Sequence, residues 1–480
     1  MTISIAWLRR NLRTTDNRVL AYAMQHSDIV IPVYVWDTYR PLNRCPNRLS
    51  FIVESVEALG KDFEELGLPL VMRRGHVHKE IARLANEVNA TTVIADRNYE
   101  PYEIERDEKT AQALSDVGAT LTLVKENVLF ESVEVRTKEG KPYTVFTPFK
   151  KAVWERVTSE AEEVIGPKRG TYTSYRSTKS YESHTPPDLG MLDQSKFSSN
   201  RIQHGGSVAA HTRWEAFKNA GLSRYKQRRD ILSDDFGTSQ LSPHIKFGTI
   251  SIRTLAREAL ELAQQPDFNE GATTFISELL WREFYYNILA SFPHVEGSNF
   301  QPIYDGLRWE QNEAHLEAWK LGRTGVPVVD AAMRQLLDTG WMHNRARMIV
   351  ASFLTKDLLI NWQEGELHFM WWLTDGDQAQ NNGGWQWSAS TGTDAQPYYR
   401  IFNPYLQSKK FDPEGEYIKR YVPELRSLPT KYIHEPHLMT PLEQSQYGCM
   451  LGEDYPLPIV DHSVQREKAR AMFEHVRTRT

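Results

Sequence analysis

A stretch near the carboxyl end of the chain holds most of the side chains that could do chemistry. Between Trp371 and Pro404 the sequence mixes indoles, carboxylates, amides and glycines, among them Asp375, Asp377 and Asn381. Indole rings suit stacking on another flat ring system. Carboxylates and amides offer acceptors for ribose, ribityl or imide groups, and glycine lets the backbone approach a ligand. The stretch predicts a wall that holds a planar heteroaromatic molecule; an aromatic core under a glycine-rich turn is the alternative.

A second candidate is a hydroxyl-rich turn ahead of a predicted short helix. The turn is made of Thr238, Ser239, Gln240, Leu241 and Ser242, with Pro243 directly after it. Hydroxyls and free backbone N–H groups at a helix start form an anion site, because the helix N-terminus carries partial positive charge. A plain helix cap is the alternative interpretation of this segment.

A third candidate is the predicted helix over 275–289. Glu278, Trp281, Arg282 and Tyr285 follow one another at i, i+3, i+4 and i+7, so they line one face. An indole, a carboxyl and a guanidinium on one stripe can stack on a flat polar ligand and hydrogen-bond its edge. The alternative is a surface ion pair between Glu278 and Arg282 beside a buried Trp281, worth only a few tenths of a kcal/mol.

The fourth candidate is a predicted helical segment over 341–362. Asn344, Arg345 and Met348 fall on one side of it. Arg345 and Arg347 lie near the helix start, where the macrodipole disfavours cations. An anionic partner such as phosphate would offset that cost, and two solvated arginines are the alternative.

These side chains need a framework, and the chain predicts two kinds. Up to about residue 130, short apolar runs alternate with helical patterns, which indicates a doubly wound parallel sheet that binds ligands beyond the carboxyl ends of its strands. Strands buried on both faces are expected over 3–8, 29–36, 70–72, 92–95 and 121–124, and helices over 48–66, 79–88 and 102–114. No G-x-G-x-x-G or Walker A sequence accompanies this pattern.

The remaining chain divides into a connection and a helical part. An ordered stretch over 143–150, a helix over 151–157 and an irregular connection over 171–193 are expected. From 206 onward helical periodicity dominates, so an all-α region is predicted. The expected division is an α/β domain over 1–130, a linker over 131–205 and a helical domain over 206–480.

Composition restricts the class of protein. Of 480 residues, 40% are apolar and 25% charged, and the net charge of −5 argues against a protein that coats nucleic acid everywhere. The two cysteines, Cys45 and Cys449, form no metal or disulfide framework, so no metal is expected. No apolar run approaches a membrane span and no signal-peptide pattern precedes the first strand, so a cytoplasmic protein without a membrane partner is expected.

Six motifs in order along the chain give it a resemblance to the photolyase/cryptochrome family, with bacterial class I deoxyribodipyrimidine photolyases as the closest subgroup. The motifs are WLRRNLR at 7–13, VFTPFK at 145–150, TSQLSPHIKFG at 238–248, ELLWREFY at 278–285, GWMHNRARM at 340–348 and DGDQAQNNGGWQW at 375–387. The resemblance implies FAD in the helical domain and light-driven splitting of cyclobutane pyrimidine dimers in UV-damaged DNA. A monomer is expected.

Roles carried over from the family fall into three groups. The residues expected to hold FAD are Tyr225, Thr238, Ser239, Gln240, Leu241, Ser242, Asp375, Gly376, Asp377 and Asn381, the last facing flavin N5. Those expected around the extruded dimer are Glu278, Trp281, Arg282, Asn344, Arg345, Met348 and Trp387, with Arg229 and Gln407 on the DNA backbone. The expected electron relay runs from Trp385 through Trp362 to Trp309. Glu278 is expected to stabilise the radical anion of the dimer.

The resemblance leaves the antenna and the biological role open. Glu100 matches the acidic position that binds folate, which implies 5,10-methenyltetrahydrofolate between the domains, yet 294–297 lacks the lysine of folate-binding relatives. A deazaflavin, a second flavin or an empty site are alternatives. A blue-light photoreceptor of the cryptochrome type is the alternative function, although Glu278, Trp281 and Asn381 match repair enzymes. A nucleotide-binding α/β protein without flavin is a third interpretation, and a local basic patch with Arg228, Arg229, Lys246, Arg345 and Lys409 would bind DNA.

Overall fold

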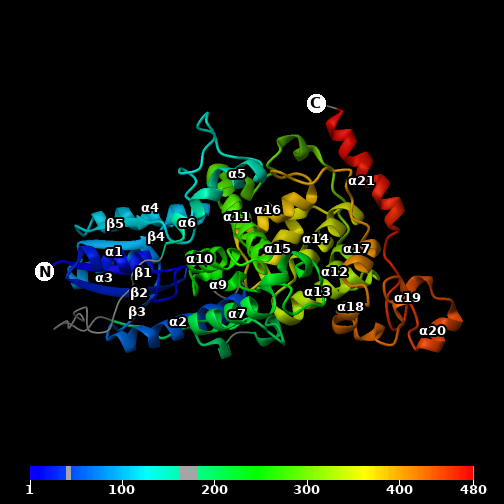
Figure 1. The fold of residues 1–480 in the computed structure, drawn as a ribbon, viewed down its shortest axis with the longest axis horizontal. Helices are drawn as coiled ribbons and strands as arrows, with labels where there is room; N and C mark the ends of the chain where they lie inside the picture. The colour runs from blue at the N-terminus through cyan, green and yellow to red at the C-terminus, as the bar shows by residue number, and fades with distance from the viewer. Residues whose placement is uncertain (39–44, 163–181, 192, 479–480) are drawn as a thin grey trace. The chain divides into compact units, whose positions relative to one another are not determined.

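Five parallel strands form the sheet of the first unit of the chain, in the order β3-β2-β1-β4-β5 (Figure 1). The computed structural model describes residues 1–38, 45–162, 182–191 and 193–478. The strands are β1 (Ile3–Leu8), β2 (Ile29–Asp37), β3 (Val71–Gly75), β4 (Thr92–Asp96) and β5 (Thr120–Val124). Since β1 pairs with both β2 and β4, the strand order reverses beside it. The predicted doubly wound parallel sheet is confirmed.

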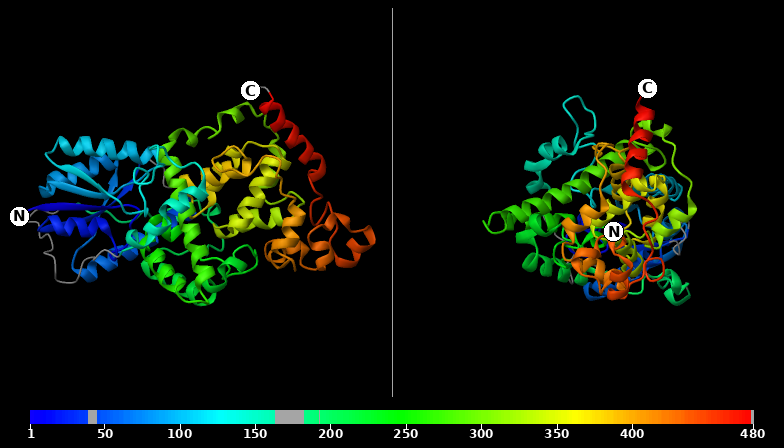
Figure 2. Two further views of the ribbon diagram at one scale, coloured as in Figure 1. Left: turned by 45° about the horizontal axis from the view of Figure 1, so that its top comes forward. Right: turned by 90° about the vertical axis from the view of Figure 1, so that its right-hand side faces the viewer.

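Helices cover both faces of this sheet, and β1 shows how the sequence specifies this. Ile5 and Trp7 lie in the cluster that also contains residues of α3 (Val77–Val88) and α4 (Pro101–Ser115). Ala6 and Leu8 lie in the cluster with residues of α1 (Arg18–His26) and α2 (Pro46–Leu66). Because successive side chains of a strand point to opposite faces, a continuous apolar run fills both layers. Figure 2 shows the blue and cyan strands with helices on either side.

Two expectations for the first part of the chain need correction. The strand predicted over 121–124 was expected to be buried on both faces, but Thr120 is exposed and the other residues of β5 are half-buried. The reason is its position at the edge of the sheet. The helix predicted over 151–157 begins earlier, because α5 runs over Phe146–Val153 and a 3-10 turn (Trp154–Arg156) leads into α6 (Val157–Glu160). Most of the connection predicted over 171–193 lies outside the described residues.

The chain divides into two units that are not the two halves of the sequence. The first unit consists of 1–196, 203–226 and 239–293, and the second of 197–202, 227–238 and 294–480. Besides the sheet, the first unit contains α7 (Ser207–Ala220), α9 (Ser242–Phe247), α10 (Ile252–Ala263) and α11 (Asn269–Ser291). The short helix α8 (Tyr225–Arg228) lies where the chain passes from the first unit to the second.

Helices dominate the second unit, and its described residues form no named strand, which confirms the predicted all-α region; the pairing of Leu451 with Tyr455 is an isolated bridge. Its main helices are α12 (Glu313–Lys320), α13 (Pro327–Thr339), α14 (Asn344–Ser352), α15 (Trp362–Trp372), α16 (Gln378–Ala389), α17 (Pro404–Phe411), α18 (Glu416–Tyr421), α19 (Thr430–Ile433), α20 (Pro441–Tyr447) and α21 (His462–Arg477). One core cluster joins α13 to α16. Within the described ranges, no helix combines the length and apolar character needed to cross a bilayer.

The helical segment predicted over 341–362 is interrupted rather than continuous. Helix α14 starts at Asn344 after the cap His343, a π-helical turn (η8) covers Phe353–Asp357, and α15 starts at Trp362. Long-range contacts explain the break: buried Asp357 accepts a bond from His462 Nδ1 at 2.6 Å, and buried Lys356 donates to the Ala389 carbonyl. π-Helical turns are rare and occur mostly as single turns within α-helices.

Candidate functional site

The predicted site residues fall into two groups, one in each unit. In the first unit, α11 presents the predicted stripe of Glu278, Trp281, Arg282 and Tyr285 as partly exposed side chains. Their neighbours Leu279, Leu280 and Phe284 are buried. One helix therefore anchors the stripe through its apolar face and leaves the polar and aromatic groups accessible.

The Arg282 guanidinium is fixed by the first unit. Its Nη1 donates to the Asn127 carbonyl at 2.7 Å and pairs with Glu283 Oε1 at 3.2 Å, and its Cζ lies 4.7 Å from the centre of the Tyr286 ring. Because these contacts already immobilise the guanidinium, hydrogen bonding to a ligand would cost little further side-chain entropy.

Glu283 is a residue that sequence reasoning missed. It is buried on the opposite side of α11 from the stripe, and its Oε2 accepts the backbone N–H groups of Leu129 and Phe130 at 2.8 and 3.0 Å. Burial raises the pKa of Glu283 to about 7, against the opposing effect of the Arg282 cation. The sequence does contain an indication of this residue: Glu283 lies on the helix face that carries Ile276, Leu279 and Leu280, where an apolar residue is expected. A carboxylate on a buried face needs hydrogen-bond partners.

The hydroxyl-rich turn leads into α9, but no side chain of the cap residue accepts a hydrogen bond from the first turn of the helix. Gln240 has a left-handed backbone with φ of 52°, and the cap residue Leu241 is fully buried and offers no side-chain acceptor. Ser242 is exposed at the helix start, and Ser239 accepts a bond from Arg213 Nε through its carbonyl. Tyr225 is buried, edge-on to Phe217 at 5.7 Å. Thr238 belongs to the second unit and is partly buried.

Glu100 lies at the start of α4, near the carboxyl ends of β1 and β4. It is buried, and its Oε1 pairs with Arg10 and with Lys246 Nζ, the latter at 3.0 Å. The carboxylate expected to bind an antenna is therefore held by two cations of its own unit.

In the second unit, Asp375, Gly376 and Asp377 connect α15 to α16. Asp377 caps α16, because its side chain accepts the Gln380 N–H at 3.2 Å. Asp375 Oδ2 pairs with Arg347 Nη2 at 2.7 Å, while its buried Oδ1 has no hydrogen-bond partner among the described residues. A buried acceptor without a hydrogen-bond partner in the protein indicates that a ligand or a water molecule donates to it.

The two arginines near the start of α14, for which an anionic partner or plain solvation was expected, both have carboxylate partners. Arg345 pairs with Asp230 at 3.0 Å and lies over the Phe411 ring, and Arg347 pairs with Asp375. Carboxylates of the same unit thus supply an anionic partner for each arginine, and a bound phosphate is not needed to balance the macrodipole. Asn344 is exposed, Met348 half-buried, and Asn344 Nδ2 lies 3.9 Å from Met348 Sδ.

His343 is a second residue that sequence reasoning missed. It caps α14 by accepting the Arg345 N–H at its Nδ1, 3.0 Å away. Burial lowers the pKa of His343 to about 4, so the ring is neutral at physiological pH. Its Nε2 is buried and has no partner within the described part of the chain, so the neutral ring presents an unused donor.

Asn381 on α16 is oriented by α15. Its side-chain amide donates to the Glu366 carbonyl at 2.9 Å, and the Glu366 carboxyl accepts from Asn382 at 3.0 Å. Glu366 was also missed. Burial raises its pKa to about 7, with the nearby Glu296 acting in the same direction.

The three tryptophans of the expected relay differ in burial and partners. Trp385 is buried against Phe369 at 5.0 Å, and its Nε1 has no hydrogen-bond partner among the residues described. Trp362 is buried, and its Nε1 donates to Asn299 at 2.9 Å. Trp309 is partly exposed beside Phe473. Trp385 and Trp362 are thus equally buried at 2% exposure, and only Trp309 is partly exposed.

Three residues of the second unit that are expected to contact DNA are partly exposed. Arg229, Trp387 and Gln407 are all half-buried, and Gln407 lies on α17 next to the exposed Lys409 and Lys410.

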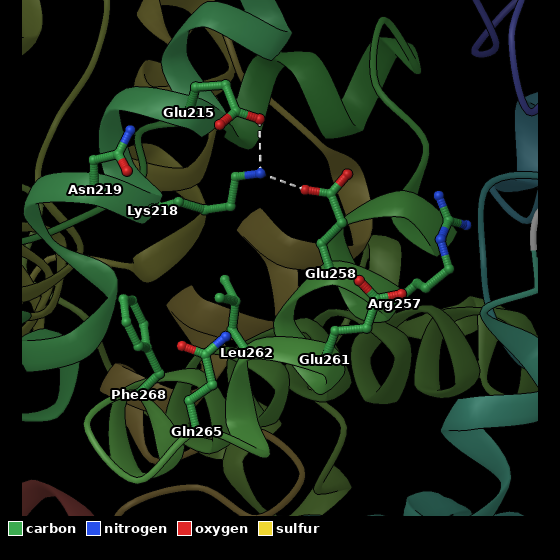
Figure 3. A pocket seen from close by; sticks show the side chains of 9 residues that line it. All are labelled: Glu215, Lys218, Asn219, Arg257, Glu258, Glu261, Leu262, Gln265 and Phe268. Atoms are coloured by element: carbon green, nitrogen blue, oxygen red, sulfur yellow. Dashed lines mark hydrogen bonds and ion pairs between the residues drawn. The ribbon is translucent and has the colours of Figure 1, made fainter.

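A pocket in the first unit contains none of the predicted site residues (Figure 3). Helices α7 and α10 line it, and Lys218 bridges Glu215 and Glu258 at 2.7 and 2.6 Å across its rim. Two carboxylates therefore neutralise Lys218, and the pocket lies apart from the residue groups described above.

Known proteins resemble the chain over its whole length. The family model for the FAD binding domain of DNA photolyase matches residues 275–475, and the DNA photolyase model matches residues 4–168. A deoxyribodipyrimidine photo-lyase of Halobacterium salinarum is 38% identical over 99% of both chains. The chain belongs to the photolyase/cryptochrome family.

Solved structures of this family share the fold. A bacterial class III photolyase from Agrobacterium tumefaciens is 36% identical and superposes with a TM-score of 0.89. The match covers 99% of this chain and 98% of the Agrobacterium chain. A cryptochrome of Synechocystis sp. PCC6803 reaches the same TM-score at 28% identity, with 98% of this chain and 99% of the other covered.

The residues of this family member fit FAD. Asp375 Oδ1, Trp385 Nε1 and His343 Nε2 are buried polar atoms that lack partners in the described part of the chain. They combine acceptors and donors with an aromatic wall, the mixture that a flavin with its ribityl and imide groups requires.

Proposed function

We propose that the chain is a deoxyribodipyrimidine photo-lyase, which splits cyclobutane pyrimidine dimers in UV-damaged DNA in a light-driven reaction that uses FAD. The observation that carries the proposal is whole-length similarity to relatives of that name, for example 38% identity over 99% of both chains to the enzyme of Escherichia coli. The FAD-binding match over 275–475 covers both the α11 stripe and Trp385.

We propose that Trp281 and Trp387 receive a dimer that leaves the duplex. A pyrimidine dimer inside a base stack cannot be reached, and extrusion costs a few kcal/mol, least for a damaged pair. Stacking on aromatic side chains returns about 1–3 kcal/mol per base. Trp281 and Trp387 are both half-buried, so each has ring surface to offer.

The chemistry divides between cofactor and protein. Bound reduced FAD supplies, on illumination, the electron that opens the two cyclobutane bonds and receives it back, so the reaction is redox-neutral. Glu278 is proposed to hydrogen-bond the edge of the dimer, where a fixed polar group stabilises developing charge best in the absence of water. Arg282 and Arg345, each fixed by a carboxylate, are proposed to hold the polar edges of the lesion.

The residues proposed to hold the flavin are assigned by the part of the molecule that each would contact. The phosphates and ribityl chain are assigned to Tyr225 and to the turn of Thr238, Ser239, Gln240, Leu241 and Ser242. Asp375, Gly376 and Asp377 are assigned to its adenine and ring system, and Asn381 to N5. As an uncharged amide that already donates to Glu366, Asn381 presents its oxygen without a fixed charge.

The relay Trp385, Trp362, Trp309 is proposed to deliver electrons that reduce oxidised FAD. 5,10-Methenyltetrahydrofolate with Glu100 is the proposed antenna, and loading the protein with this folate should add its absorption band. The division into an antenna domain over 1–130, a linker over 131–205 and a flavin domain over 206–480 is likewise a proposal, as are a monomeric state and a cytoplasmic location.

A cryptochrome-type photoreceptor is the second candidate function, because the Synechocystis cryptochrome has the same fold. Repair and signalling separate in one experiment. Reduced protein is mixed with an oligonucleotide that contains a thymine dimer and illuminated with blue light, and the return of thymine absorbance is followed. Recovery supports the photo-lyase, whereas a flavin-loaded protein that leaves the dimer intact supports the photoreceptor.

A further inference from the structure

We propose that Phe146 is a positioning residue for lesion recognition: its ring backs Trp281 and holds the indole flat for stacking on an extruded base. The inference rests on the proposed function, in which Trp281 stacks on the dimer. It assigns a role to the VFTPFK segment, whose residues lie outside every group assigned above.

The two rings form a close, nearly parallel stack. The ring centroids of Phe146 and Trp281 are 3.7 Å apart and the ring planes differ by 12°. Phe146 is buried with 7% exposure, whereas Trp281 remains partly exposed. One face of the indole is therefore covered by protein, and Trp281 keeps accessible surface beyond it.

Phe146 is itself fixed by a second layer of contacts. Its ring meets Phe284 edge-on at 5.9 Å, and Phe149, one turn later on α5, packs on the same Phe284 at 5.5 Å. Lys150 Nζ donates to Ser277 Oγ at 3.1 Å, which ties α5 to α11 one turn before Trp281. The backing ring cannot slide along the indole without breaking these contacts.

Trp281 also contacts two further aromatic rings of α11. It lies edge-on to Phe284 at 5.7 Å with an angle of 84°, and Tyr285 lies at 5.7 Å with 31°. An indole with contacts on its back and its edge occupies one rotamer before any base arrives. Binding then costs less side-chain entropy, because the indole is already immobilised before a base stacks on it.

This arrangement predicts an effect on affinity for the lesion and none on the chemical step. An aliphatic side chain in place of Phe146 would fill the volume but would not present a flat surface, so the indole could tilt. Undamaged DNA places no base on Trp281 in the proposed function, so its binding should not depend on Phe146.

The test uses the full-length, FAD-loaded protein kept in the dark. Phe146→Leu should raise the Kd for a duplex with one thymine dimer about three- to tenfold, or about 0.7–1.4 kcal/mol at 1.4 kcal/mol per tenfold, within the range of an aromatic pair. The Kd for the undamaged duplex and the repair yield per photon of saturated complex should stay unchanged. Phe146→Tyr, which keeps the ring, should restore the parental Kd.

Phe149→Leu is the matched control. Phe149 is a buried aromatic residue of the same helix that contacts Phe284 and Tyr143. This variant should lose stability and loosen the layer behind Phe146, but because the stack of Phe146 on Trp281 remains, it should keep the Kd for damaged DNA within twofold. If Phe146→Leu does not fold, Phe146→Met serves in its place. Equal loss of affinity in the Phe146 and Phe149 variants would make the effect merely structural and would overturn the inference.

A double variant separates this inference from the proposed function. In a Trp281→Ala background, Phe146→Leu should add no further loss, because it acts through the indole. If Trp281→Ala weakens binding to damaged DNA and Phe146→Leu does not, the role of Phe146 alone is overturned. Additive losses of affinity in the double variant would also overturn it. A parent protein that binds FAD but never repairs dimers would instead overturn the proposed function.

Discussion

Asn381 and Glu366 are joined by a 2.9 Å hydrogen bond from the Asn381 side-chain amide to the Glu366 backbone carbonyl, so α15 sets the orientation of the residue assigned to flavin N5. The bond uses the backbone of Glu366, which leaves the carboxyl free to bind Asn382. Orientation of Asn381 and titration of Glu366 are therefore separable by mutation.

Glu366→Gln should change how stability depends on pH. Burial raises the pKa of Glu366 to about 7 from an ordinary 4.5, so the folded chain binds more protons than the unfolded chain between these values. This group therefore lowers the free energy of unfolding as pH rises through that window, by at most about 1.4 kcal/mol per pH unit. Relative to the parent, Glu366→Gln should therefore gain thermal stability as pH rises from 4.5 to about 7. Glu364→Gln, an exposed neighbour on α15, should show no such trend, and a constant difference for Glu366→Gln would contradict the assignment.

Gly365→Ala should disturb the Trp385 site. A Cβ at position 365 would lie 2.1 Å from Trp385 Cη2, so the indole must shift. Overpacking of this kind costs about 1–3 kcal/mol, and FAD retention and photoreduction should fall with it. Gly384→Ala is the matched control on α16: no atom lies within 4 Å of its added Cβ, and a helical alanine should stabilise by about 0.5–1 kcal/mol. Normal flavin content in Gly365→Ala would show that Trp385 does not border the flavin.

Trp309→Phe should block photoreduction of oxidised FAD but spare repair by protein reduced beforehand, because the outer member of the relay is lost while the lesion site is intact. Flavin absorbance under blue light with an external reductant measures the first effect. Trp319→Phe is the control, since this buried indole lies 6.0 Å from Trp385 but outside the proposed relay. Should Trp319→Phe block photoreduction and Trp309→Phe leave it intact, the electron path would have to be reassigned.

Glu278→Ala should lower the repair yield about tenfold, the size of a lost hydrogen bond to a charged group of roughly 1.5 kcal/mol, while FAD stays bound. The yield is measured per photon on saturated complex. Glu270→Ala, on the same helix and in an exposed pair with Lys226, should repair like the parent. Equal yields in all three proteins would remove Glu278 from the reaction.

Local patterns predicted the framework well. Strand β1 spans the predicted 3–8, because a short apolar run buried on both faces has few other structures available to it. The α11 stripe is likewise partly exposed as its spacing implies, since a helix of fixed period leaves no freedom in which residues share a face.

Contacts between distant residues were not predictable in this way. The break after α14 depends on Asp357 meeting His462, and the counter-charges of Arg345 and Arg347 are Asp230 and Asp375. No local spacing encodes these pairs. The stack of Phe146 on Trp281 and the bonds from the Leu129 and Phe130 N–H groups to Glu283 were not predictable for the same reason. Each contact joins two segments that are distant in the sequence.

The central claim is that a flavin held by these residues uses light to split a dimer bound beside it. Its most direct test is the fraction of a dimer-containing oligonucleotide restored to two thymines by protein loaded with FAD alone and reduced, counted by chromatography after blue light and after an equal time in the dark. We expect restoration only in the illuminated sample, at wavelengths that the bound flavin absorbs. Restoration in the dark, or an intact dimer after illumination, would contradict the account.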